Sequence, residues 1–540
     1  MLYHWESTRP DSPYLLQPMN GKYQAISWKQ AGDQIRRMAS ALKAQNFPPG
    51  SSICIASKNC AHWIMADMAI WMAGHVSVPI YPNLSSAMIR EIIDHSESKL
   101  VFIGKLDDVQ TYLKGTPDDL IKVSFPYNAP ASMPSWDQWI KSHEPLKENP
   151  TRNHDDLATI IYTSGTTGTP KGVMHRFSSF SDSASRIIET IQLSYEERFF
   201  SYLPLAHVAE RLLTENVGLY CGGQVWFVES IDSFADNLKE TQPTVFLGVP
   251  RIWEKFQVGI LEKLPQKKMS LLLKIPLISS LIRKKIQAGL GLNQSRFNIT
   301  GAAPISTDLL EWYDKLGIKI LEAYGLSENF AYSHFARPES IRIGYVGNTW
   351  PGVTTKISDQ GEVMVKSPGN MAGYFKQDEL TKEIFTDEFL HTGDQGEIDS
   401  EGRLKITGRV KDLFKSSKGK YIAPNPIELK LSASNLVDQA CVVGTGLPQP
   451  IALVNLSEEA LRMNSGTVEK QLGELMESVN QTLDPHERMR KIVIMKEAWT
   501  VENEYLTPTM KLKRNKVEGK YQDSFSLWSN SEQTVLHSEK

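Results

Sequence analysis

The sequence has few cysteines and lacks long apolar runs, and both features narrow the class of protein. Its 540 residues include four cysteines, Cys54, Cys60, Cys221 and Cys441, and none of them lies in a Cys-x-x-Cys pair. A zinc site or a disulfide framework is therefore not expected, and we expect the reducing environment of the cytoplasm. No stretch approaches the roughly 18 apolar residues that cross a bilayer. The first residues lack the basic and apolar regions of a signal peptide, so none is expected.

The sequence also lacks an excess of charge of one sign. Lysine and arginine number 59 against 62 acidic residues, a net charge of −3, so we expect no nucleic-acid partner. Basic residues are concentrated at 405–420 and 511–520, which suits polyanionic small ligands. In residues 267–286, leucine and isoleucine are mixed with lysine and arginine, a composition typical of a helix that rests on a membrane surface. Pro276 interrupts this segment, and a helix packed against its own domain is the alternative.

Apolar runs of strand length alternate with longer amphipathic stretches over the first 350 or so residues. Examples are 52–56, 99–103, 244–247 and 318–321. This alternation predicts an α/β fold with parallel sheets. No period of 20–50 residues recurs, which excludes a solenoid.

The spacing of the apolar runs changes after about residue 353, where short predicted strands such as 361–365 and 402–406 are separated by turns. We therefore predict a large N-terminal domain, residues 1–410, that ends in a small antiparallel subdomain at about 353–410. A small α+β C-terminal domain is expected at 411–522. Residues 523–540 are predicted to form a polar, frayed tail.

Residues 162–173, Tyr-Thr-Ser-Gly-Thr-Thr-Gly-Thr-Pro-Lys-Gly-Val, are the most informative segment. Its backbone N–H groups, hydroxyls and single lysine are the groups that wrap a polyphosphate. A Walker A loop is excluded, because Pro170 and Gly172 stand where that motif needs a glycine and a hydroxyl residue. A flexible linker is the alternative, but the apolar run 157–161 predicts a buried strand that leads into the loop. We predict phosphate binding by Thr163, Ser164, Gly165, Thr166, Thr167, Gly168 and Lys171.

Five further segments carry residues that suit a nucleotide, although each has an ordinary structural alternative. The small residues at 301–304 let a planar ring approach the backbone, or form a turn. Tyr324 could stack on a base or occupy the core, and Glu328 could be an ordinary surface carboxylate. Asp394 could accept hydrogen bonds from a ribose diol or form an Asx-turn. Lys511 and Lys513, two residues apart on a predicted strand, cannot be told apart locally. The segments are 301–304, 322–328, 391–394, 408–412 and 506–514.

In this order, and over about 350 residues, the loop and these segments resemble the motifs of the adenylate-forming superfamily. This superfamily includes acyl-CoA synthetases, peptide-synthetase adenylation domains and beetle luciferases. The resemblance implies a large AMP-binding domain followed by a small mobile domain that carries an adenylation lysine. It also implies ATP, Mg²⁺ and CoA as co-substrates or cofactors, and small-molecule partners.

The resemblance assigns roles to individual residues. The adenine pocket would be lined by Gly301, Ala302 and Ala303, and Tyr324 would stack on the base. Asp394 and Arg409 would hold the ribose, and Thr163 and Glu328 would hold Mg²⁺. Lys411 would be the hinge between the domains, and Lys511 the adenylation lysine. The remaining residues implied at the ATP site are Glu322, Ala323, Gly325 and Ser327.

Three segments resemble the long-chain acyl-CoA synthetase branch of the superfamily: 203–211, 249–256 and 418–424. The first contains His207, which the resemblance makes a catalytic residue. Some long-chain enzymes carry a gating tryptophan four residues after this histidine, but Arg211 stands there in this chain. A guanidinium at the tunnel mouth would instead pair with a polar group or second carboxylate on a shorter acid.

We therefore expect an ATP-dependent acyl-CoA synthetase that acts on medium-to-long-chain fatty acids. One alternative is an adenylate-forming enzyme for another acid, or for another acyl acceptor such as a carrier protein, although the chain ends too soon for an adjoining carrier domain. A second alternative is a non-catalytic acyl- or nucleotide-binding protein, which substitution of Lys511 or Glu328 would have favoured; both residues are intact.

Overall fold

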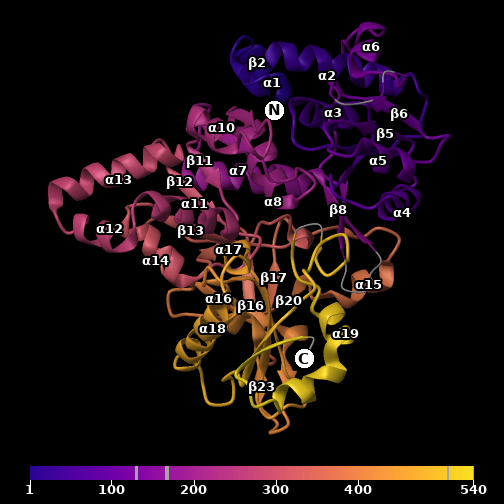
Figure 1. Ribbon diagram of the computed structural model, residues 1–540. Coiled ribbons are helices and arrows are strands. Elements are labelled where there is room, and N and C mark those ends of the chain that lie inside the picture. Colours follow the sequence, from indigo (N-terminus) through magenta and orange to yellow (C-terminus); the bar gives the residue numbers. More distant parts are fainter. Residues whose placement is uncertain (128–129, 131, 165–169, 508–509, 539–540) are drawn as a thin grey trace.

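The computed structural model describes residues 1–127, 130, 132–164, 170–507 and 510–538. The predicted phosphate-binding residues Gly165, Thr166, Thr167 and Gly168 lie outside the described residues. Three sheets form the N-terminal part of the molecule, and a four-stranded sheet forms the core of the C-terminal part, which lies in the lower half of Figure 1.

The largest sheet has nine strands in the order β15-β14-β13-β12-β11-β9-β10-β1-β2. Its centre, from β1 to β13, is parallel, whereas β2, β14 and β15 join the edges antiparallel. The sheet is therefore mixed, where the sequence predicted parallel pairing. The strands are β1 Pro13–Met19, β2 Lys22–Ser27, β9 Arg198–Ser201, β10 Gln224–Phe227, β11 Val245–Leu247, β12 Phe297–Thr300, β13 Ile320–Tyr324, β14 His334–Phe335 and β15 Asn348–Thr349.

The second sheet has seven strands in the order β18-β8-β7-β4-β3-β5-β6. Strand β7 ends at Ser164 and its antiparallel partner β8 begins at Pro170, so these strands hold both ends of the glycine-rich segment. The strands are β3 Ser52–Ala56, β4 Val76–Ile80, β5 Leu100–Ile103, β6 Ile121–Ser124, β7 Leu157–Ser164, β8 Pro170–Arg176 and β18 Gly373–Tyr374.

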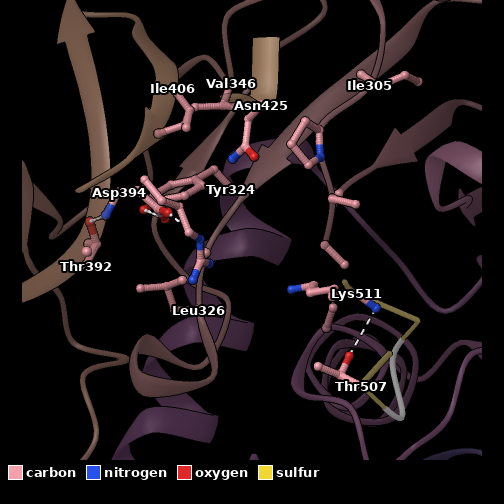
Figure 2. Close-up of a pocket in the computed structure, with 18 of the residues that line it drawn as sticks. Ile305, Tyr324, Leu326, Val346, Thr392, Asp394, Ile406, Asn425, Thr507 and Lys511 are labelled. Carbon is pink, nitrogen blue, oxygen red and sulfur yellow. Dashed lines mark hydrogen bonds and ion pairs between the residues drawn. The ribbon is translucent and has the colours of Figure 1, made fainter. Parts of the chain in front are cut away.

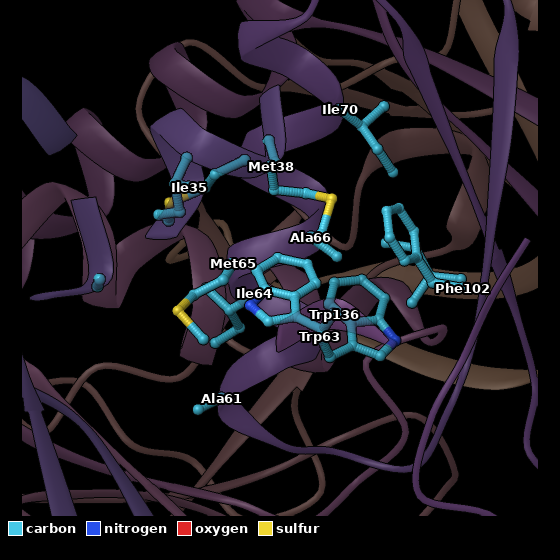
Figure 3. Packing of buried hydrophobic residues seen from close by; sticks show 14 of the residues in the cluster. Ile35, Met38, Ala61, Trp63, Ile64, Met65, Ala66, Ile70, Phe102 and Trp136 are labelled. Atoms are coloured by element: carbon cyan, nitrogen blue, oxygen red, sulfur yellow. The ribbon is translucent and has the colours of Figure 1, made fainter. Parts of the chain in front are cut away.

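Helices cover these two sheets and bury their apolar faces. Figure 3 shows one of the resulting clusters, in which Trp63 of α3 and Trp136 of α6 pack with Phe102 of β5 and Met38 of α2. The helices are α1 Leu2–Thr8, α2 Trp28–Lys43, α3 Ala61–Met72, α4 Ser86–Ser96, α5 Val109–Gly115, α6 Trp136–Lys141, α7 Phe177–Ile191, α8 Val208–Glu210, the π-helix η1 Arg211–Val217, α9 Gly218–Cys221, α10 Phe234–Thr241, α11 Pro250–Lys263, α12 Gln266–Leu272, α13 Pro276–Leu290, α14 Thr307–Lys315 and α15 Asp378–Glu383.

Residues 354–409 form the small antiparallel sheet that the close spacing of short strands predicted. Its order is β16-β17-β20-β19, with β21 paired to β20. The strands are β16 Thr354–Ile357, β17 Glu362–Lys366, β19 Phe385–Thr386, β20 Phe389–Ile398 and β21 Leu404–Arg409.

The C-terminal part is an α+β unit built on a four-stranded sheet, β24-β25-β26-β27. It follows the 3₁₀ turn η3 Val410–Asp412 and a two-stranded pair, β22 Phe414–Lys415 and β23 Tyr421–Ile422. Its elements are α16 Pro424–Ser432, β24 Val437–Val443, β25 Ile451–Leu456, α17 Glu458–Leu461, α18 Ser465–Asn480, β26 Lys491–Ile494, α19 Arg514–Ser529 and β27 Val535–His537.

The prediction of a frayed tail from residue 523 is wrong. Residues 514–529 form α19, which buries Phe525 and Trp528, and β27 adds a parallel strand to β26 through Val535 and Leu536. The polar average of the segment concealed these few apolar residues, which are placed to meet the sheet.

The segment 267–286 forms two helices, because Pro276 begins α13 instead of continuing α12. Proline is well suited to the first helical position, where its missing N–H is not needed. Among the described residues, no helix has the length and apolar character needed to cross a bilayer.

Candidate functional site

A cleft of about 1880 Å³ lies where the C-terminal unit meets the rest of the molecule. Its walls come from the ends of β7, β8, β12 and β13, from the small antiparallel sheet and from the loop that precedes α19. Figure 2 shows Tyr324 and Asp394 close together, with Lys511 and Thr507 at another part of the wall. The cleft therefore combines segments that are up to 350 or so residues apart in the sequence.

The Tyr324 side chain is oriented by the carboxylate of Asp394. The Tyr324 hydroxyl donates a hydrogen bond of 2.7 Å to Asp394 Oδ2, and Arg409 Nε lies 3.0 Å from Oδ1. Adjacent antiparallel positions on β20 and β21 place Asp394 opposite Arg409. Burial raises the pKa of the Asp394 carboxyl, and the Arg409 charge opposes that shift. Each carboxylate oxygen can still accept one more hydrogen bond, as a ribose diol would require.

The turn after β12 brings Gly301, Ala302 and Ala303 to the cleft wall. A Cβ on Gly301 would lie 3.0 Å from the Ala323 carbonyl oxygen, so a larger residue would push the ends of β12 and β13 apart. Ala302 has φ of 66°, which is costly for a residue with a side chain and occurs most often where function requires it. The result is a shallow wall of backbone and methyl groups, which a planar ring can approach closely.

Four more predicted residues of the 322–328 segment line the same wall: Glu322, Ala323, Gly325 and Ser327. Glu322 Oε1 accepts a hydrogen bond of 3.0 Å from the Gly344 N–H, and burial raises the pKa of this carboxyl to about 7. The Gly344 N–H is therefore a structural partner of this carboxylate.

The Glu328 carboxylate lines the cleft and is held by Tyr374. The Tyr374 hydroxyl donates to Glu328 Oε1 at 2.8 Å, and Lys171 Nζ lies 5.3 Å from the Tyr374 ring centroid. Thr163, opposite Lys171 in the β7–β8 ladder, also lines the cleft, and the side chain of Ser164 lies outside the described residues. Among the described residues, no group of three or more His, Cys, Asp or Glu could hold a metal ion. A single carboxylate suits Mg²⁺ that arrives bound to phosphate oxygens.

Lys511 enters the cleft from the C-terminal unit. It lies on a loop closed by an isolated bridge between Leu506 and Leu512, and its N–H donates to Thr507 Oγ1 at 3.0 Å. The predicted strand is therefore wrong for 511–513, because α19 begins immediately afterwards at Arg514. Lys511 is accessible from the cleft, yet crowding by protein atoms lowers the pKa of its ammonium, with a further contribution from Arg409.

Both lysines of the 511–513 pair line the cleft, but their surroundings differ. Lys511 interacts electrostatically with Arg409, Asp394 and Glu328, whereas the Lys513 N–H donates to the Tyr505 carbonyl just before α19. Arg409, Asp394 and Glu328 therefore converge on Lys511.

His207 lines the cleft at the start of α8, where its Nδ1 accepts the Ala209 N–H at 3.2 Å. Burial lowers the pKa of the imidazole to about 4, and the nearby Lys511 charge acts in the same direction. His207 is therefore neutral at physiological pH and can take part through hydrogen bonds.

Arg211 does not reach the cleft, and its proposed place at the tunnel mouth is wrong. The side chain is fully buried and forms ion pairs with Asp67 and Glu215. The distance from Arg211 Nε to Glu215 Oε2 is 3.1 Å. Trp63, Trp71 and Phe180 surround the guanidinium. A buried charge must be paired, and this pairing turns Arg211 away from any substrate. It can neither gate the cleft nor bind a second carboxylate there.

The floor of the cleft on the Arg211 side is apolar. Cleft-lining side chains from α7, α8, η1 and two strands give it an aliphatic surface: Ile187, Ile191, Val208, Ala209, Leu212, Leu213, Leu247 and Ile299. A surface of this kind buries hydrocarbon and offers no charged partner to a polar substituent.

Two cleft residues were missed by sequence reasoning. Tyr374 positions both Glu328 and the region of Lys171, and Asn425 lines the wall of the cleft. Neither of them lies in a motif with recognisable spacing, whereas Thr392, which also lines the wall, lies in the predicted segment 391–394. Tyr374 is brought to the site by the antiparallel pairing of β18 with β8, which no local pattern in the sequence indicates.

Lys411 lies in η3, between the last strand of the antiparallel sheet and β22 of the C-terminal unit. It is exposed and also lines the cleft. An ion pair also joins the two parts of the molecule: Arg251 Nη2 of α11 lies 3.0 Å from Asp438 Oδ1 of β24. The structure therefore shows a conformation in which Lys511 faces Arg409, Asp394 and Glu328.

Comparison with known proteins agrees with this geometry. The AMP-binding enzyme family matches residues 2–375, and the AMP-binding enzyme C-terminal domain matches residues 411–527. A long-chain-fatty-acid–CoA ligase, FadD15 of Mycobacterium bovis, is 30% identical and aligns with 98% of this chain and 97% of its own length. Long chain acyl-CoA synthetase 5 of Arabidopsis thaliana is 27% identical over 93% of this chain and 86% of its own.

Solved structures show the same fold at lower identity. The anthranilate CoA ligase AuaEII, in complex with anthranoyl-AMP, superposes with a TM-score of 0.79 at 20% identity and covers 97% of both chains. The o-succinylbenzoate CoA synthetase MenE of Bacillus subtilis, in complex with an acyl-adenylate, superposes with a TM-score of 0.75 at 21% identity, over 96% of this chain and 97% of its own.

The fold and the cleft define a two-part α/β enzyme of the adenylate-forming type. The chain belongs to the AMP-binding enzyme family, with matches to both its main and its C-terminal domain.

Proposed function

We propose that this chain is an ATP-dependent acyl-CoA synthetase of the long-chain-fatty-acid–CoA ligase type. The observation that carries the proposal is the convergence of Lys511 with Tyr324, Asp394, Arg409 and Glu328 on one cleft that continues into an apolar floor. The long-chain ligases that align along nearly the whole chain support the same conclusion.

In the first step, a carboxylate oxygen of the acid attacks the α-phosphorus of ATP and expels pyrophosphate. This step replaces oxide, an impossible leaving group, with AMP. Negative charge builds on the α-phosphoryl oxygens, so fixed cations and N–H donors aimed at them lower the barrier. Lys511 would supply the main cation and Lys171 a second, while Tyr324, Asp394 and Arg409 hold the nucleoside. Mg²⁺, when bound, would be held by Glu328 and Thr163 and would offset the charge of the phosphate oxygens.

In the second step, the CoA thiol attacks the acyl-adenylate carbonyl and releases AMP. No enzyme cysteine is needed, and Cys54, Cys60, Cys221 and Cys441 are all buried. Lys511 occupies the cleft in the present conformation and would obstruct the thiol. We propose that the C-terminal unit rotates about Lys411 between the two steps.

Replacing Lys411 with proline is expected to preserve adenylation and to remove most thioester formation. Rotation about this residue requires φ to change, and proline holds φ near −65°. The check is to measure ATP–pyrophosphate exchange and acyl-CoA formation separately, with Lys411→Ala as the control that keeps φ free. If both half-reactions fall equally in the proline variant, Lys411 is not the hinge.

The preferred acid is expected to be a medium-to-long-chain fatty acid. Each methylene buried against the apolar floor contributes about 0.8 kcal/mol, so several methylenes give strong discrimination in kcat/KM against acetate. A panel from acetate to oleate, with aryl and dicarboxylic acids included, measures this. The variant Ala209→Phe, which adds bulk to the floor, should shift the optimum to shorter chains. Highest kcat/KM on a short or aromatic acid would contradict the chain-length assignment and leave the ligase assignment intact.

One experiment separates the ligase from its alternatives. Acid-dependent ATP–pyrophosphate exchange would exclude a non-catalytic binding protein, and CoA-dependent release of AMP would then identify CoA as the acyl acceptor. Exchange without CoA-dependent turnover would instead indicate another acceptor, such as a carrier protein.

We also propose a cytoplasmic protein that contacts a membrane peripherally through residues 267–286. The mixed apolar and basic composition of this segment supports the contact, and the substrates proposed here partition into bilayers.

A further inference from the structure

The helices α12 and α13 project from the edge of the N-terminal part (Figure 1). They expose apolar side chains. Leu271 is 64% exposed, Leu277 89% and Leu281 71%, with Ile275 and Ile278 also exposed beside them. Large apolar residues scattered singly are ordinary on protein surfaces, but a group of five on two consecutive helices and the turn between them is not.

The other side of this helical pair is anchored to α14. Trp312 Nε1 donates to Gln266 Oε1 at 2.9 Å, and Arg283 Nε donates to the Lys315 carbonyl at 3.1 Å. Met269, a residue of α12, is buried. Because α13 turns once every 3.6 residues, Leu277 and Leu281 share a face with Lys284, away from the face of Arg283 and Gln287 that contacts the protein. The exposed leucines are therefore held outward.

The same surface is strongly basic. Between Glu262 and Asp308 the sequence has eight lysines and arginines and no acidic residue, although the whole chain carries a net charge of −3. Within the part of the chain that the structure describes, Lys267, Lys268, Lys274, Lys284 and Lys285 form no ion pair, and all five are exposed. Cations beside an apolar face are complementary to a bilayer whose headgroups are anionic.

We infer that the exposed faces of α12 and α13 form a docking surface for an anionic lipid bilayer. Leu271, Ile275, Leu277, Ile278 and Leu281 would enter the headgroup region, and the neighbouring lysines would contact lipid phosphates. One short helix links this surface to the cleft, because α14 contacts α12 and α13 through Trp312 and Lys315 and begins at Thr307, which lines the cleft wall. Docking would therefore bring the cleft to the phase in which fatty acids are stored. The docking surface on α12 and α13 refines the membrane contact proposed above, and binding of lipid there does not depend on the ligase assignment.

The test is co-sedimentation of the full chain with phosphatidylcholine vesicles, prepared with and without phosphatidylglycerol, over a range of salt concentrations. The wild-type chain should bind the anionic vesicles more tightly, and binding should weaken as salt rises. Leu277→Glu/Leu281→Glu should lower the partition coefficient by about tenfold or more, because it removes apolar contact and adds repulsion. Lys284→Glu/Lys285→Glu should remove most of the preference for anionic vesicles.

Matched controls separate docking from general effects. Leu461→Glu changes an equally exposed leucine, 68%, on the C-terminal unit, and Lys99→Glu/Lys114→Glu changes two exposed lysines elsewhere. Both controls should bind vesicles like the wild type. Acid-dependent pyrophosphate exchange with a water-soluble acid should be unchanged in the α13 variants, which confirms that they fold and keeps the result distinct from any failure of the ligase proposal.

Two results would overturn the inference. Vesicle binding that is absent in the wild type, or unchanged in both α13 variants, would show that this surface does not dock on lipid. A wild-type dimer in sedimentation equilibrium that Leu277→Glu/Leu281→Glu converts to a monomer, without effect on vesicles, would show that a second copy of the chain covers the surface instead.

Discussion

Replacement of Lys511 by alanine is expected to abolish acyl-adenylate formation and to spare transfer of the acyl group from supplied acyl-AMP to CoA. Lys511 is the residue of the C-terminal unit that approaches Arg409, Asp394 and Glu328 in this conformation. Losing a fixed donor to developing charge costs roughly 3 kcal/mol or more, a hundredfold or greater decrease in rate. Acid-dependent ATP–pyrophosphate exchange measures the first step, and acyl-CoA formation from synthetic acyl-AMP measures the second.

Lys513→Ala is the matched control, because Lys513 lies two residues away, lines the same cleft and has its backbone N–H bound to Tyr505. It should retain most of the exchange activity. Wild-type exchange in Lys511→Ala, or an equal loss in the two variants, would show that Lys511 is not the adenylation lysine.

The substitution Glu328→Gln is expected to remove the Mg²⁺ dependence of ATP binding and to lower turnover by about a hundredfold or more. The amide keeps the shape of the side chain but not the negative charge that a hard cation requires, and even outer partners of metal ligands cost 10–100-fold when lost. ATP affinity measured by calorimetry at several Mg²⁺ concentrations provides a readout separate from activity.

Tyr374→Phe serves as the comparison for this variant. It removes the hydrogen bond to Glu328 Oε1 and leaves the carboxylate in place, so a smaller, partial loss of Mg²⁺ affinity is expected. If Glu328→Gln responds to Mg²⁺ as the wild type does, Glu328 is an ordinary surface carboxylate and the proposed metal site is wrong.

Much of the site could be predicted from the sequence because its residues occur in short local segments. The turn at Gly301, the segment that contains Tyr324 and Glu328, and the positions of Asp394 and Arg409 each place a particular chemical group within a few residues of a strand end. Backbone approach, hydrogen bonding and charge at such positions depend on neighbours in the chain, so a sequence pattern can report them. The α/β class follows similarly from the alternation of apolar runs with amphipathic stretches.

Features that depend on distant partners could not be predicted. Arg211 occupies a motif position that suggested a substrate contact, yet its partner Asp67 lies 144 residues earlier and turns it into the core. Tyr374 reaches Glu328 only because β18 pairs with β8 across about 200 residues of chain. The order of strands in a sheet decides such contacts, and local composition carries little information about that order.

The C-terminal segment and the α12–α13 surface also combine features set by local sequence with features set by tertiary packing. Residues 514–537 are polar on average, but β27 pairs with the edge strand β26, and α19 buries Phe525 and Trp528. In 267–286 the sequence by itself determined the mixture of leucines and lysines and the break at Pro276. Which of those leucines face outward was decided by the tertiary structure, because packing of α12 and α13 on α14 determines which face of each helix remains in contact with water.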